Sequence, residues 1–201
     1  MTTEQMICDA RAGGEAARGL LLDHYRNYLR LLARVEVGRR LQRKLDESDL
    51  VQEAMLDAHR HFDNFRGTDE RQFVTWLRRI LAGKVSNLVR HYYGTRRRDL
   101  RLEEDLEAGF SAASRRLSHD LADSLTSPSQ QVMRREQGVL LADALEKLRP
   151  DYRDAIVLRH LEGLTFPEIA KRMNRSQDSV EKLWLRALAR LRQEFDSPSD
   201  S

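Results

Sequence analysis

Apolar residues in the first half of the chain recur every three or four positions. This spacing places them on one face of an α-helix, the face that packs into a protein core. Three such stripes follow one another: Leu21, Tyr25, Tyr28, Leu32 and Val35; then Val51, Met55, Ala58 and Phe62; then Phe73, Leu77, Ile80, Leu81 and Leu88. We predict a helix for each stripe, with Asp46 as N-cap of the second. Thr68 or Asp69 caps the third, where Gln72 can complete a capping box on Asp69.

The C-terminal third also has helical periodicity. Val132, Leu140, Leu141, Leu145 and Leu148 predict a helix that begins after the Ser-Pro-Ser at 127–129 and ends before Pro150. A short helix follows from Tyr152 to His160, and Gly163 closes it. Thr165 and Glu168 form a capping box around Pro167. After a turn at 174–175, Ser176 caps a last, longer helix, whose apolar positions are Val180, Leu183, Trp184, Ala187, Leu188 and Leu191.

Residues 99–129 have a different character from the segments on either side. Short acidic runs alternate there with Ser, Ala and Gly, and we find no long apolar stripe. We expect a linker that is partly helical at best. The predicted fold is all-α, with two small helical domains on a flexible linker. The expected boundaries are a tail at 1–15, a first domain at 16–100, the linker at 101–128 and a second domain at 129–196.

Composition narrows the class of protein. Among 201 residues, 33% are charged and 6% aromatic, which favours two modest cores over one large core. Cys8 is the single cysteine, so an internal disulfide and a multi-thiolate metal site are both excluded. The N-terminus has no basic segment followed by an apolar run, and no stretch approaches membrane-spanning length. We expect a cytoplasmic protein that does not insert into membranes.

The net charge of +3 hides a strongly basic stretch at 71–98. This stretch has eight Arg or Lys residues, no acid, and four aromatic residues: Phe73, Trp76, Tyr92 and Tyr93. A segment without carboxylates attracts phosphate, and flat rings among arginines can stack on unpaired bases. A solvated basic helix face is the alternative. Trp76 shares a flank with Phe73 and Ile80, which favours a place in the core.

Two further patterns bear on binding. Asp49, Gln52 and Glu53 lie at i, i+3 and i+4, on the outer side of the second predicted helix. Near the C-terminus, two short helices joined by a tight turn form a helix-turn-helix pattern, which a purely structural helical hairpin shares. No catalytic set of residues is found. His59 and His61 point about 200° apart on a helix, so they cannot chelate one metal ion together.

Three segments in this order resemble the extracytoplasmic-function group of bacterial sigma factors. They are DLVQEAMLDAHRHFDNF, then FVTWLRRILAGKVSNLVRHYY, then LEKLRPDYRDAIVLRHLEGLTFPEIAKRMNRSQDSVEKLWLRALARL. The resemblance covers nearly the whole chain except the first fifteen or so residues. It implies two helical domains, called regions 2 and 4. It also implies two partners, core RNA polymerase and promoter DNA.

The resemblance assigns roles to particular residues. Four in the DLVQE segment are expected to dock on the clamp coiled coil of the largest polymerase subunit: Asp49, Leu50, Gln52 and Glu53. Region 2 is expected to melt the −10 element and hold a flipped base through Asn64, Phe65, Arg66, Arg79, Lys84, Asn87, Arg90, Arg96 and Arg97. Region 4 is expected to read the −35 element through Arg175, Ser176, Gln177, Ser179, Lys182 and Arg186. The polymerase flap is a further expected contact of the chain.

The sequence departs from the family pattern at five positions on the two helices expected to bind DNA. Asp178, Glu181 and Leu183 replace the more frequent glycine, basic residue and arginine, which leaves the −35 preference open. Gly83 and Asn87 replace the more usual Asn and Asp in the melting helix.

The resulting hypothesis is a promoter-specificity subunit with no chemistry, cofactor, metal or small-molecule substrate of its own. Its acids near Glu103 to Glu107 would enter a basic channel of the polymerase. The sequence leaves open whether a separate anti-sigma factor binds this chain. The main rival is a stand-alone helix-turn-helix regulator. An enzyme such as a small nuclease or nucleotidyltransferase is a second rival. It would need paired carboxylates in a cleft, and Asp49 and Glu53 are the best-placed pair on a predicted helix.

Overall fold

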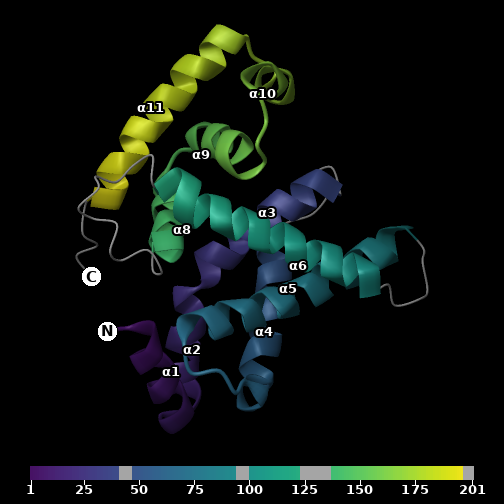
Figure 1. Cartoon of the computed structure of the whole chain (residues 1–201), viewed down its shortest axis with the longest axis vertical. Coiled ribbons are helices and arrows are strands. Elements are labelled where there is room, and N and C mark those ends of the chain that lie inside the picture. The colour runs from purple at the N-terminus through teal and green to yellow at the C-terminus, as the bar shows by residue number, and fades with distance from the viewer. Residues whose placement is uncertain (41–46, 94–99, 123–136, 197–201) are drawn as a thin grey trace. The chain divides into compact units, whose positions relative to one another are not determined.

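The computed structural model describes residues 1–40, 47–93, 100–122 and 137–196, and every regular element within these ranges is helical (Figure 1). The chain divides into two compact units, Met1–Ser111 and Ala112–Ser201. This confirms the predicted all-α class. The elements of the first unit are α1 (Thr3–Ala12), α2 (Gly14–His24), α3 (Arg26–Arg40), α4 (Glu47–Arg60), the 3₁₀ turn η1 (Phe62–Asn64), α5 (Glu70–Tyr93) and most of α6 (Leu100–Arg115).

The core of the first unit follows the predicted stripes. All five apolar positions of the first stripe and all four of the second are buried. They come from α2, α3, α4 and η1, except Tyr25, which lies at the junction of α2 and α3. On α5, Phe73, Leu77 and Leu81 are buried, whereas Ile80 and Leu88 are partly exposed. The ring of Phe73 lies 5.2 Å from that of Tyr25 and 5.3 Å from that of Phe65. Aromatic contacts therefore connect α5 to the junction of α2 and α3 and to the loop after α4.

The N-terminal segment differs from the predicted tail. Residues 3–12 form α1, which packs against α2 and buries Ile7 and Ala10. Thr2 and Gln5 cap it reciprocally: each side chain accepts a hydrogen bond from the other's backbone N–H. The Thr3 hydroxyl lies 3.0 Å from the hydroxyl of Tyr25. The buried stripe of α1 spans only two helical turns, too short to stand out in an otherwise polar sequence.

The segment expected to lack a long apolar stripe is also helical. Helix α6 continues from Arg115 into the π-helical turn η2 (Arg116–Leu121). Its buried side chains are spaced four, three, four and four residues apart: Leu106, Phe110, Ala113, Leu117 and Leu121. The expectation that this segment is partly helical at best was therefore wrong up to residue 122, whereas its role as a linker stays a prediction. Residues 123–128 lie outside the described part of the chain. Small residues between the large ones obscured the helical period.

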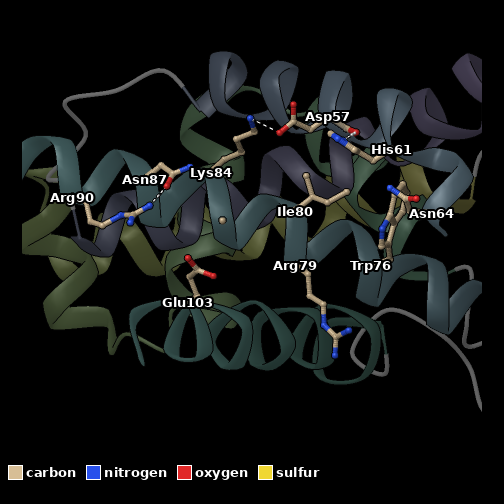
Figure 2. Close-up of a pocket in the computed structure, with 11 residues that line it drawn as sticks. Asp57, His61, Asn64, Trp76, Arg79, Ile80, Lys84, Asn87, Arg90 and Glu103 are labelled. Carbon is tan, nitrogen blue, oxygen red and sulfur yellow. Dashed lines mark hydrogen bonds and ion pairs between the residues drawn. The ribbon is translucent and has the colours of Figure 1, made fainter. Parts of the chain in front are cut away.

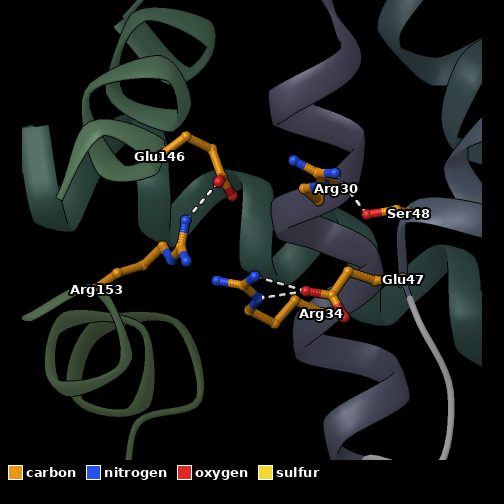
Figure 3. Close-up of polar contacts among 6 residues, drawn as sticks. All are labelled: Arg30, Arg34, Glu47, Ser48, Glu146 and Arg153. Carbon is orange, nitrogen blue, oxygen red and sulfur yellow. Dashed lines mark hydrogen bonds and ion pairs between the residues drawn. The ribbon is translucent and has the colours of Figure 1, made fainter. Parts of the chain in front are cut away.

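Polar contacts fix helix ends within each unit (Figure 3). In the first unit, Arg34 on α3 donates two hydrogen bonds, of 2.8 and 2.6 Å, to one carboxylate oxygen of Glu47 at the start of α4. Arg30, one turn earlier, donates to the hydroxyl of Ser48. These contacts hold the first turn of α4 against α3.

The second unit contains α8 (Gln137–Lys147), α9 (Pro150–Ile156), the π-helical turn η4 (Val157–Leu161), α10 (Phe166–Met173) and α11 (Gln177–Asp196). Arg153 on α9 is paired with Glu146 on α8 (Figure 3). Leu158, Ile169, Ala170 and Val180 form a core that connects η4, α10 and α11. Leu141, Leu145 and Leu148 are buried as predicted, but Leu140 is 48% exposed, so placing it on the buried stripe was wrong. Val132 and the 127–129 helix start lie outside the described residues.

Candidate nucleic-acid interface

The loop at 64–68 is held between two helices. Asp69 caps α5 by accepting the Gln72 N–H at 2.8 Å, and the Gln72 side chain accepts the Thr68 N–H at the same distance. The predicted cap at Asp69 is confirmed. The side chain of Gln72 bonds the N–H of Thr68 and not that of Asp69, so the capping box is shifted by one residue on this side. A side chain at Gly67 would bring its Cβ within 2.6 Å of the Phe65 ring. Gly67 is therefore needed for the loop to close over that ring.

Helix α1 braces this loop from the other side. The Arg11 guanidinium donates to the carbonyl oxygens of Phe65 at 3.2 Å and of Gly67 at 2.5 Å, and it lies over the Phe65 ring. Arg18 on α2 pairs with Asp63 at 2.6 Å. Neither Arg11 nor Arg18 was foreseen as a contributor to the site. The signal available in the sequence was the Thr2–Gln5 capping-box pattern, which marks the start of α1.

A pocket of about 560 Å³ opens between this loop and the start of α5. We call it the loop pocket. Its lining includes the predicted residues Asn64, Phe65, Arg66 and Arg79, together with Trp76. Asn64, Arg66 and Arg79 are exposed, whereas Phe65 is buried and packs against Trp76 with ring centroids 5.2 Å apart. Phe65 therefore forms the base of the pocket, and the polar residues form its rim.

A second hollow, of about 530 Å³, continues along α5 and is referred to below as the α5 groove (Figure 2). It contains Lys84, Asn87 and Arg90, and it shares Asn64, Trp76 and Arg79 with the loop pocket. The predicted basic residues of α5 that the structure describes thus lie along one side of the helix. Arg96 and Arg97 lie outside the described residues.

The cations of the α5 groove have acidic neighbours from two helices. The Lys84 ammonium is 2.5 Å from the Asp57 carboxylate on α4, and Arg79 is 3.5 Å from Glu107 on α6. Figure 2 shows Lys84 turned toward Asp57, and Arg90 in contact with Asn87. Lys84 is only 20% exposed, as expected for a stem that packs on the apolar side, whereas Arg79 is 66% exposed. A phosphate entering this groove would have to compete with carboxylates.

The outer face of α4 matches its predicted polarity. Asp49, Gln52 and Glu53 are exposed, and Arg26 donates to the Gln52 side chain at 3.0 Å. Leu50, assigned to the same binding segment, is 6% exposed and belongs to the core. The surface that α4 offers to a partner is therefore polar and mainly acidic, with Leu50 supporting it from beneath.

The second unit contains the helix-turn-helix. The Thr165–Glu168 capping box that starts α10 is present. Asn174 adopts the left-handed conformation, with φ 53°, and this ends α10 and redirects the chain. Ser176 then caps α11 by accepting the Ser179 N–H at 3.3 Å. The predicted turn and both caps are confirmed.

The start of α11 presents polar side chains. Arg175, Ser176, Gln177, Lys182 and Arg186 are exposed, and Ser179 is partly exposed. Two intrahelical contacts engage this face: Gln177 donates to Glu181 at 2.7 Å, and Lys182 donates to Asp178 at 2.8 Å. Val180 and Leu183 are buried beneath them. The arrangement suits a recognition helix, since its polar face is outward and its apolar face is braced.

Two groups in the second unit have shifted pKa values. Burial, together with the Arg159 guanidinium, lowers the pKa of His160, and Asp120 opposes this shift. The Nε2 atom of His160 accepts the Trp184 indole N–H at 3.2 Å, which requires that nitrogen to be unprotonated. Hydrogen bonds from the Thr165 hydroxyl and backbone N–H lower the pKa of the Glu168 carboxyl. His160 thus contacts α11 through Trp184, and Glu168 contacts the N-cap of α10.

Within the described ranges, no group of three or more His, Cys, Asp or Glu residues is placed to hold a metal ion. None of the helices described there combines the length and apolar composition that a bilayer crossing requires.

Comparison with known proteins agrees with these features. A family model for sigma-70 region 2 matches residues 18–95, and one for sigma-70 region 4 matches residues 139–191. The chain is 29% identical over 190 residues to the ECF RNA polymerase sigma-E factor of Haemophilus influenzae, covering 93% of this chain and 92% of that protein. It is 28% identical to the sigma-E factor of Escherichia coli K12, covering 93% and 91% of the two chains. It is 29% identical to the RNA polymerase sigma-H factor of Pseudomonas aeruginosa, covering 92% and 89%.

The two region models match the two units in the order that the sequence predicted, α4 and α5 falling in the first match and the helix-turn-helix in the second. The relatives extend over both matches and the segment between them. The chain belongs to the sigma-70 family of transcription initiation factors, in its extracytoplasmic-function group.

Proposed function

We propose that this chain is an alternative sigma factor, which binds core RNA polymerase and directs it to a set of promoters without performing a chemical step itself. The observation that carries this proposal is that one chain combines three features: an acidic outer face on α4, a basic helix α5 with no acidic residue after Glu70, and a helix-turn-helix in the second unit. The region 2 match does not favour a regulator that uses the helix-turn-helix alone. As a subunit of a bacterial RNA polymerase, the chain would act in the cytoplasm.

The outer face of α4 is the proposed docking surface for the clamp coiled coil of the largest polymerase subunit. Asp49, Gln52 and Glu53 are exposed together, whereas the opposite side of the helix is buried. Two carboxylates and an amide on a rigid helix suit a partner surface rich in Arg or Lys. Leu50 contributes by holding the helix against the core. The region 4 unit would contact the flap.

The loop pocket is the proposed receptor for a base flipped out of the −10 element. Its volume of about 560 Å³ is within the ordinary range of small-ligand sites. Unstacking a base costs a few kcal/mol, which contacts made after flipping must offset. Asn64 and Arg66 at the rim can bond a base or its phosphates, while Arg79, Lys84, Asn87 and Arg90 continue the path along α5. Trp76, partly exposed in both hollows, has one edge in the aromatic core and another available to nucleic acid.

The N-terminal half of α11 is the proposed −35 reader. Gln177, Ser179, Lys182 and Arg186 have groups that can bond base edges or phosphates in the major groove, and Arg175 and Ser176 in the turn can contact the backbone. Gln177 and Lys182 are engaged with Glu181 and Asp178 in the free protein. Binding would exchange these exposed contacts for DNA, at little cost because exposed pairs contribute little to stability.

Docking on the polymerase can be tested by charge removal on α4. The double variant Asp49→Asn with Glu53→Gln should weaken binding to purified core polymerase at least about tenfold, because it removes charge from the centre of the proposed interface. Glu104→Gln with Asp105→Asn is the matched control, since both acids are exposed on α6 and the change in net charge is the same. Equal weakening by the two doubles, measured by fluorescence anisotropy, would contradict docking through α4. Whether an anti-sigma factor competes for the same face can be tested in this assay once such a protein is in hand.

A further inference from the structure

The N-terminal part of α6 lies against the DNA-facing side of α5. Residues 100–111 belong to the same compact unit as α5. Within that stretch, Glu103 lines the α5 groove together with Lys84, Asn87 and Arg90. Glu107, one turn further on, pairs with Arg79 at 3.5 Å. Figure 2 shows the Glu103 carboxylate on the α5 side of α6 and the Arg79 side chain directed toward α6.

Carboxylates on this face of α6 occupy positions where phosphates would be expected. Glu103 and Glu107 are spaced i, i+4, so they project from one side of the helix toward the basic side of α5. Their neighbours Glu104 and Asp105 are both exposed. The acidic run at 103–107 is therefore divided between two faces, of which only one meets the groove.

Two kinds of packing hold this stretch of α6 in place. Leu106 and Phe110, on the same side as Glu103 and Glu107, are fully buried. At Gly109 the helix backbone approaches α3 so closely that a Cβ atom would lie 2.5 Å from a carboxylate oxygen of Glu36, whose side chain is fully buried. A glycine in mid-helix lowers helix stability, and here it permits this close contact.

We propose that residues 100–111 of α6 are an intramolecular cover, which competes with single-stranded −10 DNA for the basic side of α5. This inference rests on the proposed function, because it assumes that the α5 groove is a DNA path. Arg79 cannot pair with Glu107 and a phosphate in the same geometry, and Glu103 repels a phosphate entering beside it. DNA binding and docking of α6 are therefore negatively coupled, and weakening either strengthens the other.

Three variants of the full-length chain test the cover without touching the basic residues. Glu103→Gln with Glu107→Gln removes the facing carboxylates. Glu104→Gln with Asp105→Asn makes the same charge change on the outer face. Gly109→Ala leaves the charge unaltered but puts a methyl group against Glu36, and alanine favours the helix itself. Affinity is measured by anisotropy of a fluorescein-labelled, mixed-sequence single-stranded DNA of about 12 nucleotides, a length within known single-strand site sizes.

The cover predicts that the Glu103/Glu107 double binds this DNA at least about fivefold more tightly than the Glu104/Asp105 double. Gly109→Ala should also bind more tightly than the unaltered chain, with helix content unchanged by circular dichroism. Equal affinities for the two doubles would overturn the proposal, and so would a folded Gly109→Ala protein that binds like the unaltered chain. If Gly109→Ala fails to fold, the comparison of the doubles decides alone.

Failure of the cover is distinguishable from failure of the proposed function. If the unaltered chain directs specific starts with core polymerase and the doubles bind DNA equally, only the cover is wrong. If no variant directs a start with an active core, the proposed function is wrong, whatever the order of DNA affinities.

Discussion

Acidification should weaken the fold of the helix-turn-helix unit through His160. The ring of His160 lies nearly parallel to that of Trp184 and accepts the indole N–H at 3.2 Å. Burial first, and the Arg159 guanidinium second, lower the pKa of His160 from its ordinary 6.5, while Asp120 works in the opposite direction. Protonating Nε2 would remove the acceptor and place a charge in a half-buried site.

The sign of the effect follows from proton binding. Between the lowered folded pKa and the ordinary value of 6.5, the unfolded chain binds more protons than the folded chain. The stability contributed by neutral His160 is therefore complete above pH 6.5 and is lost as the pH falls through this window. Loss of one hydrogen bond of this kind costs about 1 kcal/mol.

Urea denaturation at about pH 7.5 and about pH 5.5 measures this loss across the window in which a neutral histidine becomes charged. Trp76→Phe leaves Trp184 as the only tryptophan, so its fluorescence reports the second unit. In that background, acidification should lower the free energy of unfolding of the protein with His160 by about 1 kcal/mol more than that of the His160→Gln variant. The glutamine does not titrate, and its amide oxygen can still accept the indole N–H. The same loss in both proteins would refute the role of His160.

Four further substitutions test the scaffold by urea denaturation. Gly83→Ala should stabilise the first unit by about 1 kcal/mol, because the added mid-helix Cβ would have no described atom within 4 Å beyond its chain neighbours and the adjacent backbone of its own helix; destabilisation would contradict this. Phe65→Ala should cost about 3–5 kcal/mol because the ring is buried, whereas Arg66→Ala, exposed beside it, should change stability by no more than about 0.5 kcal/mol. Thr165→Ala should cost about 1 kcal/mol by removing the capping box of α10, and an NMR titration should show the pKa of Glu168 returning toward its ordinary value.

The helices of both units could be predicted wherever a long apolar stripe coincided with a capping signal. Helix α5, with its apolar stripe from Phe73 and its Asp69 cap, and helix α10, with the Thr165–Glu168 box, are examples, because burial and capping leave periodic or paired residues in the sequence. The stripe from Leu21 to Val35, predicted as one helix, divides at Tyr25 into α2 and α3. Helices α1 and α6 were missed for opposite reasons. The stripe of α1 is short, and that of α6 is long but diluted by Ala, Ser, Gly and surface acids.

The candidate site could be predicted as a set of residues, but its internal pairing could not. The sequence indicates that Lys84 and Arg79 lie on or beside a basic helix. It does not indicate that Asp57 on α4 and Glu107 on α6 meet them, because contacts between helices depend on crossing geometry. Phe65 was assigned to DNA by position in a family motif, yet its ring fills the space against Trp76 and Gly67. Burial of that ring gives it a supporting role in the loop pocket.

The central claim is that this chain gives a polymerase promoter specificity, and run-off transcription tests it most directly. Purified core polymerase from the same organism is incubated with genomic fragments, with and without the full-length chain. The account predicts discrete transcripts from a subset of fragments only when the chain is present, and their loss with the Asp49→Asn, Glu53→Gln double. No specific start from any fragment, with a core that initiates normally with another sigma factor, would contradict it.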